Sequence, residues 1–336
     1  MVRLAAIAWL ALCAIPARGA VILPVAGTGA SVYNGDGIAA TAAALGRPEG
    51  VGVDRAGNVY VADTKNHRIR RIDAVTGLIA TVAGCGNPGI VSAEEGIPAL
   101  SATLYNPVSV AVDASGSVYL TDQFNGCIRR VGAATQPIST FAGGGTASIP
   151  PYGDGGSATV ATLSFPGGIA VDRSGTLFIA DTGHHLVRKV DPVTLVITSL
   201  AGTGSKGYAG DGGPATAALL NNPSRVAVDA AGNVYITDQA SSEGNQRIRM
   251  VNAATGDITT IAGTGAAGFG GDGGPAAAAQ LSTPNGIAVT GSGTAYIADQ
   301  LNRRVRATYP SVGTIRTVAG TGATGYAGDG GPAVLA

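Results

Sequence analysis

Charge is scarce in this sequence and sums to zero. Only 12% of the 336 residues are charged, and 21 acidic residues balance 21 basic ones. A neutral chain lacks the basic field that attracts nucleic acid or an anionic membrane, so we expect neither as a partner. The sequence also has no Gly-x-Ser-x-Gly and no His-Glu-x-x-His motif, two signatures of hydrolases. No catalytic residue is therefore assigned.

Long apolar runs are missing after the N-terminus. Leu4 to Ile15 is an apolar stretch of about a dozen residues, which is too short to span a bilayer. Arg3 precedes it and Ala17-Arg18-Gly19 follows it, which is typical of a signal peptide over residues 1–19. We therefore expect an exported product, secreted or periplasmic, without a transmembrane segment once the signal is cleaved.

What the sequence does contain is a block of about fifty-seven residues that occurs five times. Each copy begins at a proline and has an aspartate fifteen residues later. The prolines are Pro48, Pro107, Pro166, Pro223 and Pro284, and the aspartates are Asp63, Asp122, Asp181, Asp238 and Asp299. An Ala-Gly pair and an acidic turn, usually Gly-Asp-Gly, follow in each copy. A fixed period indicates an array of units that cannot bury their apolar faces alone.

One copy predicts four short strands. Residues 50–53, 58–62, 68–72 and 78–83 are β-prone segments separated by turn residues. Four antiparallel strands and a crossover describe a propeller blade, so the fold class is an all-β propeller. The predicted blades are residues 48–84, 107–143, 166–202, 223–263 and 284–320. Each crossover is expected to contain a brief helix or 3₁₀ turn. Seven arginines of the third strands are expected to face outward: Arg70, Arg71, Arg129, Arg130, Arg188, Arg249 and Arg304.

Residues 59–72, Val-Tyr-Val-Ala-Asp-Thr-Lys-Asn-His-Arg-Ile-Arg-Arg-Ile, resemble the core of an NHL repeat. The resemblance covers nearly all of residues 21–336 and implies a propeller that usually has six blades. Residues 21–27 resemble only a last strand, and residues 321–336 resemble only a crossover. We therefore favour a six-bladed design that is truncated, with closure at five blades or an open edge as the alternatives.

The two cysteines that would remain after signal cleavage are Cys85 and Cys127. Cys85 follows the last strand of the first copy, and Cys127 begins the third strand of the second. In an up-and-down blade these points fall on the same face of neighbouring blades. Export would permit a disulfide, which we expect. The alternative is two separate thiols with Cα atoms too far apart to bridge.

Repeated polar residues are more simply explained by the fold than by function. The five aspartates that end each second strand, with Asn66, Asn125 and Asn302, line one face of the predicted disc. Repetition in every blade favours a structural role, in which each aspartate accepts N–H groups of its own turn. A working site needs different groups in different blades.

The positions at which the copies differ are therefore the better candidates. Near the start of the first strands these are Glu49, Ser109, Arg225 and Asn285. Glu49 and Asn285 carry oxygen ligands of the kind that Ca²⁺ prefers, and they are the candidates for a metal site. His184 and His185 lie in the loop after the second strand of copy three, on the same binding face, whereas His67 is two copies away.

Two functions follow from these residues. The first is an exported, non-catalytic module that binds an extracellular protein or a small ligand across the crossover face. NHL propellers serve as binding modules, sensor domains and, more rarely, lyases. The second is a metal-dependent hydrolase or lyase at the channel mouth, of the kind found in gluconolactonase-like propellers. The residues assemble no acid–base pair for that chemistry, and we favour the first.

Overall fold

The computed structural model describes residues 20–90, 95–133, 137–146, 149–239 and 245–336. The expected signal peptide, residues 1–19, lies outside this part of the chain. Strands account for the regular structure, and the helical segments described are three-residue 3₁₀ turns. No helix within the described ranges is long and apolar enough to cross a membrane. The predicted all-β fold is therefore confirmed.

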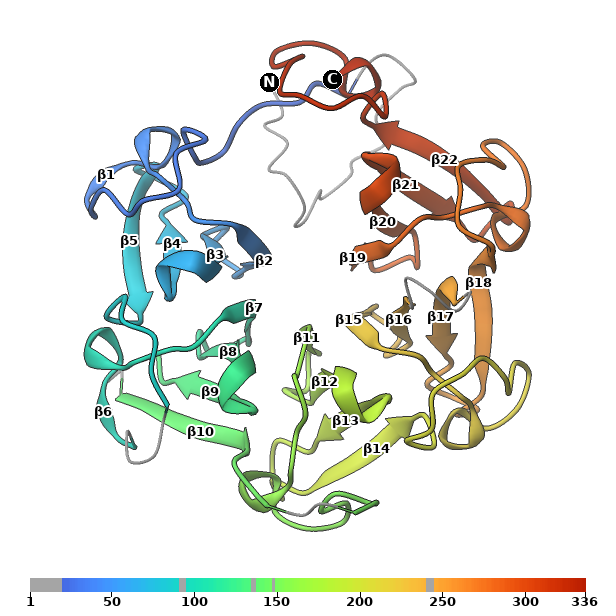
Figure 1. Cartoon of the computed structure of the whole chain (residues 1–336), viewed down its shortest axis with the longest axis horizontal. Helices are drawn as coiled ribbons and strands as arrows, with labels where there is room; N and C mark the ends of the chain where they lie inside the picture. Colours follow the sequence, from blue (N-terminus) through green and yellow to red (C-terminus); the bar gives the residue numbers. More distant parts are fainter. Residues whose placement is uncertain (1–19, 91–94, 134–136, 147–148, 240–244) are drawn as a thin grey trace. The chain divides into compact units, whose positions relative to one another are not determined.

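Each copy of the repeat forms one antiparallel sheet of four consecutive strands, which we call a blade (Figure 1). Blade 1 is β2 Pro48–Val53, β3 Val59–Asp63, β4 Arg68–Ile72 and β5 Leu78–Ala83. Blade 2 is β7 Pro107–Val112, β8 Val118–Asp122, β9 Cys127–Val131 and β10 Pro137–Gly143. Blade 3 is β11 Ile169–Val171, β12 Leu177–Asp181, β13 Leu186–Val190 and β14 Ile197–Ala201. Blade 4 is β15 Pro223–Val228, β16 Val234–Asp238, β17 Gln246–Val251 and β18 Ile258–Gly265. Blade 5 is β19 Pro284–Val289, β20 Ala295–Asp299, β21 Arg304–Tyr309 and β22 Thr314–Ala319.

The crossovers add short elements to the outer edges of the blades. Two-residue strands, β1 Ile38–Ala39 and β6 Ile97–Pro98, pair with the fourth strands of blades 1 and 2. The expected 3₁₀ turns follow, at η1 Ala40–Ala42, η3 Ala99–Ser101, η5 Ala158–Val160, η7 Ala215–Ala217, η8 Ala276–Ala278 and η10 Ala333–Leu335. A second set follows the second strands, at η2 Thr64–Asn66, η4 Gln123–Asn125, η6 Thr182–His184 and η9 Gln300–Asn302.

The described chain divides into two compact units. The three-blade unit contains Ala26–His184 and Arg188–Ser199. The two-blade unit contains the described residues up to Val25, His185–Val187 and Leu200–Ala336. Five blades of the predicted propeller type are present, and the expectation of a sixth stays a prediction.

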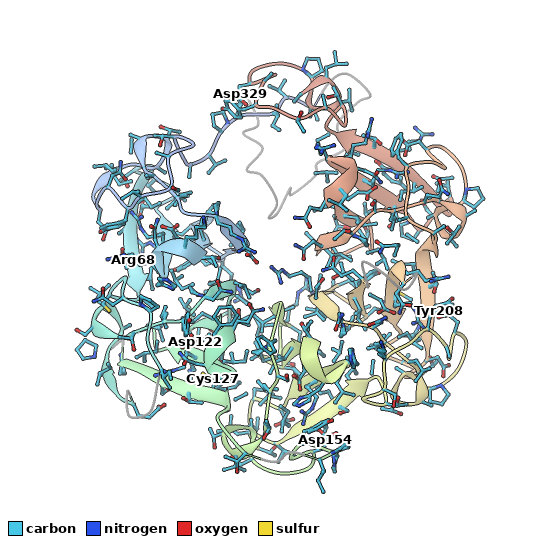
Figure 2. The ribbon with its side chains drawn as sticks, viewed as in Figure 1. Arg68, Asp122, Cys127, Asp154, Tyr208 and Asp329 are labelled. Carbon is cyan, nitrogen blue, oxygen red and sulfur yellow. The ribbon has the colours of Figure 1, made fainter. Side chains whose placement is uncertain are left out.

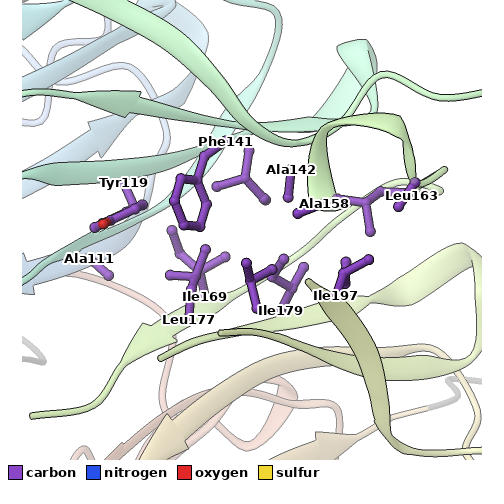
Figure 3. Close-up of a cluster of buried hydrophobic side chains, with 13 residues drawn as sticks. Ala111, Tyr119, Phe141, Ala142, Ala158, Leu163, Ile169, Leu177, Ile179 and Ile197 are labelled. Carbon is purple, nitrogen blue, oxygen red and sulfur yellow. The ribbon is translucent and has the colours of Figure 1, made fainter. Parts of the chain in front are cut away.

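Apolar side chains fill the space between neighbouring blades of one unit. Leu177 and Ile179 of β12 and Ile197 of β14 pack in one buried cluster with Tyr119 and Phe141 of blade 2 (Figure 3). Alternate residues of each strand point to opposite faces of a sheet, so blades 2 and 3 bury apolar side chains on the faces that they turn toward each other. No single blade has a core of its own, as a repeat array predicts.

The first strands of blades 1 and 2 approach so closely that glycine is required at their contact. A Cβ atom on Gly50 of β2 would lie 2.6 Å from the Val108 carbonyl oxygen and 2.6 Å from the Ser109 Cα of β7. A Cβ on Gly52 would lie 2.8 Å from the Val110 carbonyl oxygen. These are backbone atoms, which cannot move aside without displacing the strand.

Gly50→Ala should therefore lower the free energy of unfolding by about 1–3 kcal/mol, the usual cost of overpacking. Gly213→Ala is the matched control, since a Cβ there would lie 3.7 Å from its nearest neighbour, the Gly210 carbonyl oxygen. Urea denaturation of both variants measures the difference. Equal stability of the two variants would contradict the close approach of β2 and β7.

Candidate functional site

Every blade contains one arginine that is completely buried. The five are Arg70, Arg129, Arg188, Arg249 and Arg306, all at 0% exposure and each in the third strand of its blade. The sequence-based expectation that these third-strand arginines face outward is wrong for Arg70, Arg129, Arg188 and Arg249, and it overlooked Arg306. Outward positions do exist on the same strand: the Arg71 side chain, next to Arg70, is 41% exposed.

The buried arginine joins two carboxylates that are far apart in sequence. In blade 4, the Nη1 atom of Arg249 lies 3.3 Å from Asp238 Oδ2, and its Nη2 atom lies 2.7 Å from Asp211 Oδ1. Asp238 ends the second strand, whereas Asp211 belongs to the crossover that enters the blade. Blade 5 repeats the arrangement with Arg306, Asp299 and Asp272, at 3.4 and 2.6 Å. A charge inside a protein is tolerated only with such partners.

The buried arginines of the three-blade unit also lie beside acidic residues. Arg70 lies between Asp63 and Asp36, at 3.5 and 2.8 Å. Arg188 lies between Asp181 and Asp154, the second of which is labelled in Figure 2. In blade 2 the acid of the crossover is Glu95, whose Oε1 is 3.8 Å from Arg129 Nη2. The aspartate of the Gly-Asp-Gly motif in the crossover thus forms an ion pair with the buried arginine. Its position in a glycine-rich turn did not indicate this role.

The aspartate that ends each second strand is structural, although its partner differs from the one expected. Asp63 Oδ1 accepts the N–H of Gly46 at 2.6 Å, seventeen residues earlier, where the chain enters the first strand. Asp122, Asp181, Asp238 and Asp299 do the same for Tyr105, Ser164, Asn221 and Ser282, each at 2.7 Å. The aspartate therefore holds the start of the blade rather than only its own turn.

The asparagines predicted on the binding face donate hydrogen bonds to these aspartates. The side-chain amides of Asn66, Asn125 and Asn302 donate to Asp63, Asp122 and Asp299 at 2.9, 2.9 and 2.8 Å. Asn245 does this for Asp238 at 3.1 Å in blade 4. Sequence reasoning missed Asn245, because the four-residue insertion in that copy shifts it away from the motif.

Burial raises the pKa of several of these aspartates, and most clearly that of Asp238. Loss of hydration raises the pKa of Asp238 to about 6, because its contacts with Asn221, Asn245 and Arg249 offset only part of that penalty. Burial likewise raises the pKa of Asp63 and of Asp299 above the usual range. These shifts belong to structural aspartates of blades 1, 4 and 5 and do not by themselves mark a catalytic acid.

The candidates on the first strands do not form a metal centre within either unit. Glu49 of β2 pairs with Arg47 at 2.9 Å, and the Ser109 hydroxyl of β7 accepts the N–H of Ile169 at 3.2 Å. In the two-blade unit, the Arg225 guanidinium donates to the Ser224 carbonyl at 3.1 Å, and Asn285 is half-buried in β19. Among the described residues, no group of three or more His, Cys, Asp or Glu side chains could hold a metal ion. The Ca²⁺ site at Glu49 and Asn285 stays a prediction.

The three histidines have separate roles. His184 replaces the usual asparagine: its Nδ1 lies 2.9 Å from Asp181 Oδ2, and its ring stacks on Tyr152 with centroids 3.7 Å apart. His185 Nδ1 accepts the N–H of Asn222 at 3.1 Å, and His67 Nδ1 lies 3.4 Å from the N–H of Asn106. Burial lowers the pKa of His67, which favours the neutral ring that an acceptor nitrogen requires.

The disulfide expected between Cys85 and Cys127 is not present, since both residues are free thiols in the structure. Cys127 packs inside blade 2, opposite Asp122 and Gly143, and burial raises the pKa of its thiol to about 12. Cys85 is held elsewhere: its carbonyl accepts Arg68 of blade 1 at 2.7 Å, and its N–H donates to Ala102 at 2.8 Å. Each cysteine is thus fixed by the packing of its own surroundings.

A row of aromatic rings lies where the crossovers enter blades 2 and 3. The centroids of Tyr105 and Phe124 are 4.9 Å apart, and those of Phe124 and Phe165 are 6.1 Å apart, both edge to face. His67 extends the row, 6.2 Å from Tyr105. The exposed fractions of Tyr105, Phe124 and Phe165 are 36, 50 and 57%. We call these three residues the aromatic row.

The repeat itself shows that the fold does not require these rings. The positions equivalent to Phe124 are Lys65, Gly183 and Leu301, and those equivalent to Phe165 are Arg47, Asn106, Asn222 and Thr283. Phe165 has a φ of 45°, a left-handed conformation that a bulky side chain rarely adopts. The other copies also have a positive φ at this position, so the backbone belongs to the repeat and the exposed ring is what sets Phe165 apart. An exposed aromatic residue at a variable position points to function rather than to packing. Sequence reasoning sought variation inside the first strands and missed it in the preceding loops.

Blades of this form, joined by crossovers with the same 3₁₀ turn, define a β-propeller. Residues 45–72 and 163–190 match the NHL repeat family, so the chain contains NHL repeats. It is 31% identical over 276 residues to Protein SUPPRESSOR OF QUENCHING 1, chloroplastic, of Arabidopsis thaliana, covering 79% of this chain and 25% of that protein. The chain thus spans about a quarter of that curated relative.

Solved structures agree on the fold. A chain of a nidogen/laminin complex superimposes with a TM-score of 0.54 at 17% identity, covering 80% of this chain and 78% of that one. A gluconolactonase from Xanthomonas campestris superimposes with a TM-score of 0.52 at 14% identity, covering 80% of this chain and 74% of that one. At these identities the likeness concerns the fold alone.

Replacing a buried arginine should be far more damaging than replacing its exposed neighbour. Arg70→Met leaves Asp63 buried without its cation, and we expect a loss of about 3–5 kcal/mol in unfolding free energy. Arg71→Met, one residue along the same strand, should cost little, because that side chain is partly in water. Chemical denaturation checks this, and similar losses in the two variants would contradict the buried role of Arg70.

Asp238 should make stability depend on pH in an unusual direction. Its folded-state pKa of about 6 lies above the ordinary value of 3.8, so the folded protein holds this proton more tightly than the unfolded chain does. The contribution of Asp238 to stability is therefore greatest at low pH and is lost as the pH rises from about 4 to above 6. The stability of the wild type relative to Asp238→Asn should fall over this range in urea titrations. A constant difference, or one that grows with pH, would contradict the raised pKa.

Proposed function

We propose that the chain is an exported, non-catalytic binding module that recognises a protein partner through the aromatic row. The observation that carries this proposal is the set of exposed rings at positions where no other copy has an aromatic residue. Rings of this kind supply large contact areas at low entropic cost and dominate many protein interfaces. Export rests on the signal-like residues 1–19.

The surroundings of the aromatic row suit a partner that is partly polar. The Asn106 side chain donates to Gln123 Oε1 at 2.8 Å, and Gln123 donates in turn to the Pro166 carbonyl at 3.4 Å. This chain of amides lies beside Tyr105, Phe124 and Phe165 in sequence and links the loops that carry them. An apolar centre beside such polar groups is the usual composition of a non-obligate interface.

A metal-dependent hydrolase is the second candidate, suggested by Glu49 and Asn285 and by the likeness in fold to a gluconolactonase. The contacts favour it less, because Glu49 pairs with Arg47 at 2.9 Å. Calcium-dependent lactone hydrolysis that is lost in Glu49→Ala would establish this candidate instead.

The binding module is tested by giving the aromatic row the residues of other blades, in the triple variant Tyr105→Ser, Phe124→Lys and Phe165→Asn. Affinity for a partner isolated from the extracellular proteins of the source culture should fall roughly tenfold or more, by calorimetry with the purified partner. The thermal midpoint should be unchanged or slightly higher, because Asn suits the left-handed backbone at position 165 better than Phe does.

Leu301→Lys is the matched control, since Leu301 occupies the position of Phe124 in blade 5 and is 60% exposed. It should leave the affinity unchanged. A partner that binds the triple variant as tightly as the wild type would overturn the assignment. So would saturable binding of a glycan to the wild type that the triple variant loses, because the row would then be a carbohydrate site.

A further inference from the structure

A pocket of about 230 Å³ lies between blades 4 and 5, inside the two-blade unit. Tyr235 and Ile261 line it from blade 4, and Thr308, Pro310 and Gly313 line it from blade 5. Pro310 and Gly313 belong to the turn between β21 and β22 and are exposed, whereas Thr308 is buried. The pocket therefore extends from the surface to the space between the two sheets.

The interface between blades 2 and 3 shows what the repeat packs at the same place. Three lining positions have counterparts in its buried cluster, namely Tyr119 for Tyr235, Phe141 for Ile261 and Val190 for Thr308. The Phe141 ring packs edge to face on Tyr119, with centroids 4.9 Å apart and planes at 77° (Figure 3). Blade 4 has an isoleucine in place of that ring. The pocket thus lies beside a tyrosine, where the other interface has a benzene ring.

A second replacement leaves more space beside Tyr235. Leu177 of β12 packs in one cluster with Phe141, and the residue at its position in blade 5 is Ala295. Ala295 is completely buried, in one cluster with Tyr235. An alanine in place of a leucine leaves a gap that a closely packed interior fills only in part.

Thr308 adds a buried hydroxyl to this wall of the pocket. The other copies have an apolar residue at its position: Ile72, Val131, Val190 and Val251. Thr308 is 5% exposed, and its Oγ1 accepts the N–H of Ala295 at 3.3 Å. Within the described ranges, no hydrogen bond uses the hydroxyl proton itself. Because a buried donor without an acceptor costs free energy, a ligand that offers an acceptor atom would gain by bonding it.

Met250 sets this interface apart as well. It lies directly opposite Tyr235 in the pairing of β16 and β17, and it lines the pocket. The first three blades have a cation at its position: Arg71, Arg130 and Lys189. In blade 2 the guanidinium carbon of Arg130 is 5.8 Å from the centroid of the Tyr119 ring. Met250 instead offers a flexible thioether, which makes favourable contacts with aromatic rings.

We propose that this pocket binds a small molecule that has one benzene ring and one hydrogen-bond acceptor oxygen. The ring would pack on Tyr235 as Phe141 packs on Tyr119, and the oxygen would accept the Thr308 hydroxyl. An apolar cavity of about 150 Å³ holds benzene. This pocket, at about 230 Å³, therefore also has room for a short substituent. The proposal is independent of the aromatic row, which lies in the three-blade unit.

The test uses acetophenone as the probe and ethylbenzene as a probe that lacks the oxygen, each titrated into the full chain and followed by NMR. Acetophenone should bind saturably. Thr308→Val keeps the shape of the side chain and removes the hydroxyl. It should weaken acetophenone binding roughly three- to tenfold and leave ethylbenzene binding unchanged.

Filling the pocket with the residue of blade 2 locates the site. Ile261→Phe should abolish the binding of both probes and leave the thermal midpoint of the free protein unchanged or higher. Ile261→Val, the matched control, copies Val82 of blade 1 and should still bind both probes. If Ile261→Phe does not fold, Met250→Arg replaces it, since blades 1 and 2 have arginine there; it should weaken both probes.

Three results would each overturn the proposal. The first is the absence of saturable acetophenone binding to the wild type. The second is undiminished binding to a folded Ile261→Phe or Met250→Arg variant, which would place the probe elsewhere. The third is an equal loss of both probes in Thr308→Val, because the hydroxyl would then have only a structural role. The Tyr105→Ser, Phe124→Lys and Phe165→Asn triple variant should bind acetophenone like the wild type.

Discussion

One fully buried guanidinium in each blade connects the parts of the repeat that are most distant in sequence. Arg249 joins Asp238, at the end of the second strand, to Asp211 of the crossover that enters the blade. Asp238 in turn holds the N–H of Asn221, at which the first strand begins. A single cation thus links the third strand, the second strand, the crossover and the entry to the blade.

Such an interaction gives specificity more than net stability. The cost of removing three charges from water is offset only when every partner is in place, so an incorrect register would leave a buried charge alone. The raised pKa of Asp238 shows how far desolvation outweighs its favourable contacts.

Much of the fold could be predicted from the sequence, because the period and the alternation of apolar residues are local signals. The strands expected at residues 68–72 and 78–83 match β4 and β5, and the 3₁₀ turns occur in the crossovers. The direction of the arginines could not be predicted in this way. Arg70 and Arg71 are adjacent in sequence, and the residues that receive Arg70 include Asp36, which a crossover brings in from far along the chain. The prediction of a disulfide was wrong for a related reason, because corresponding positions on neighbouring blades do not determine what surrounds each thiol.

The sequence predicted which kind of position carries function, but not where in the repeat those positions lie. The rule that differences between copies carry function leads to the aromatic row, yet it was applied to the first strands, where Ser109 serves the contact between blades. Phe124 and Phe165 come together only because the 3₁₀ turn after one strand meets the loop before the next blade. Their exposure and the positive φ of Phe165 are visible only in three dimensions.

A double-mutant cycle on blade 4 tests the central role of the buried arginine most directly. Arg249→Met, Asp211→Asn and the double variant would be unfolded in urea beside the wild type. The account predicts a coupling energy of roughly 1.5–3 kcal/mol between the two positions, as expected for a charged hydrogen bond that is shielded from water. Additive losses, with coupling near zero, would show that the guanidinium and the crossover acid stabilise the blade independently and would contradict it.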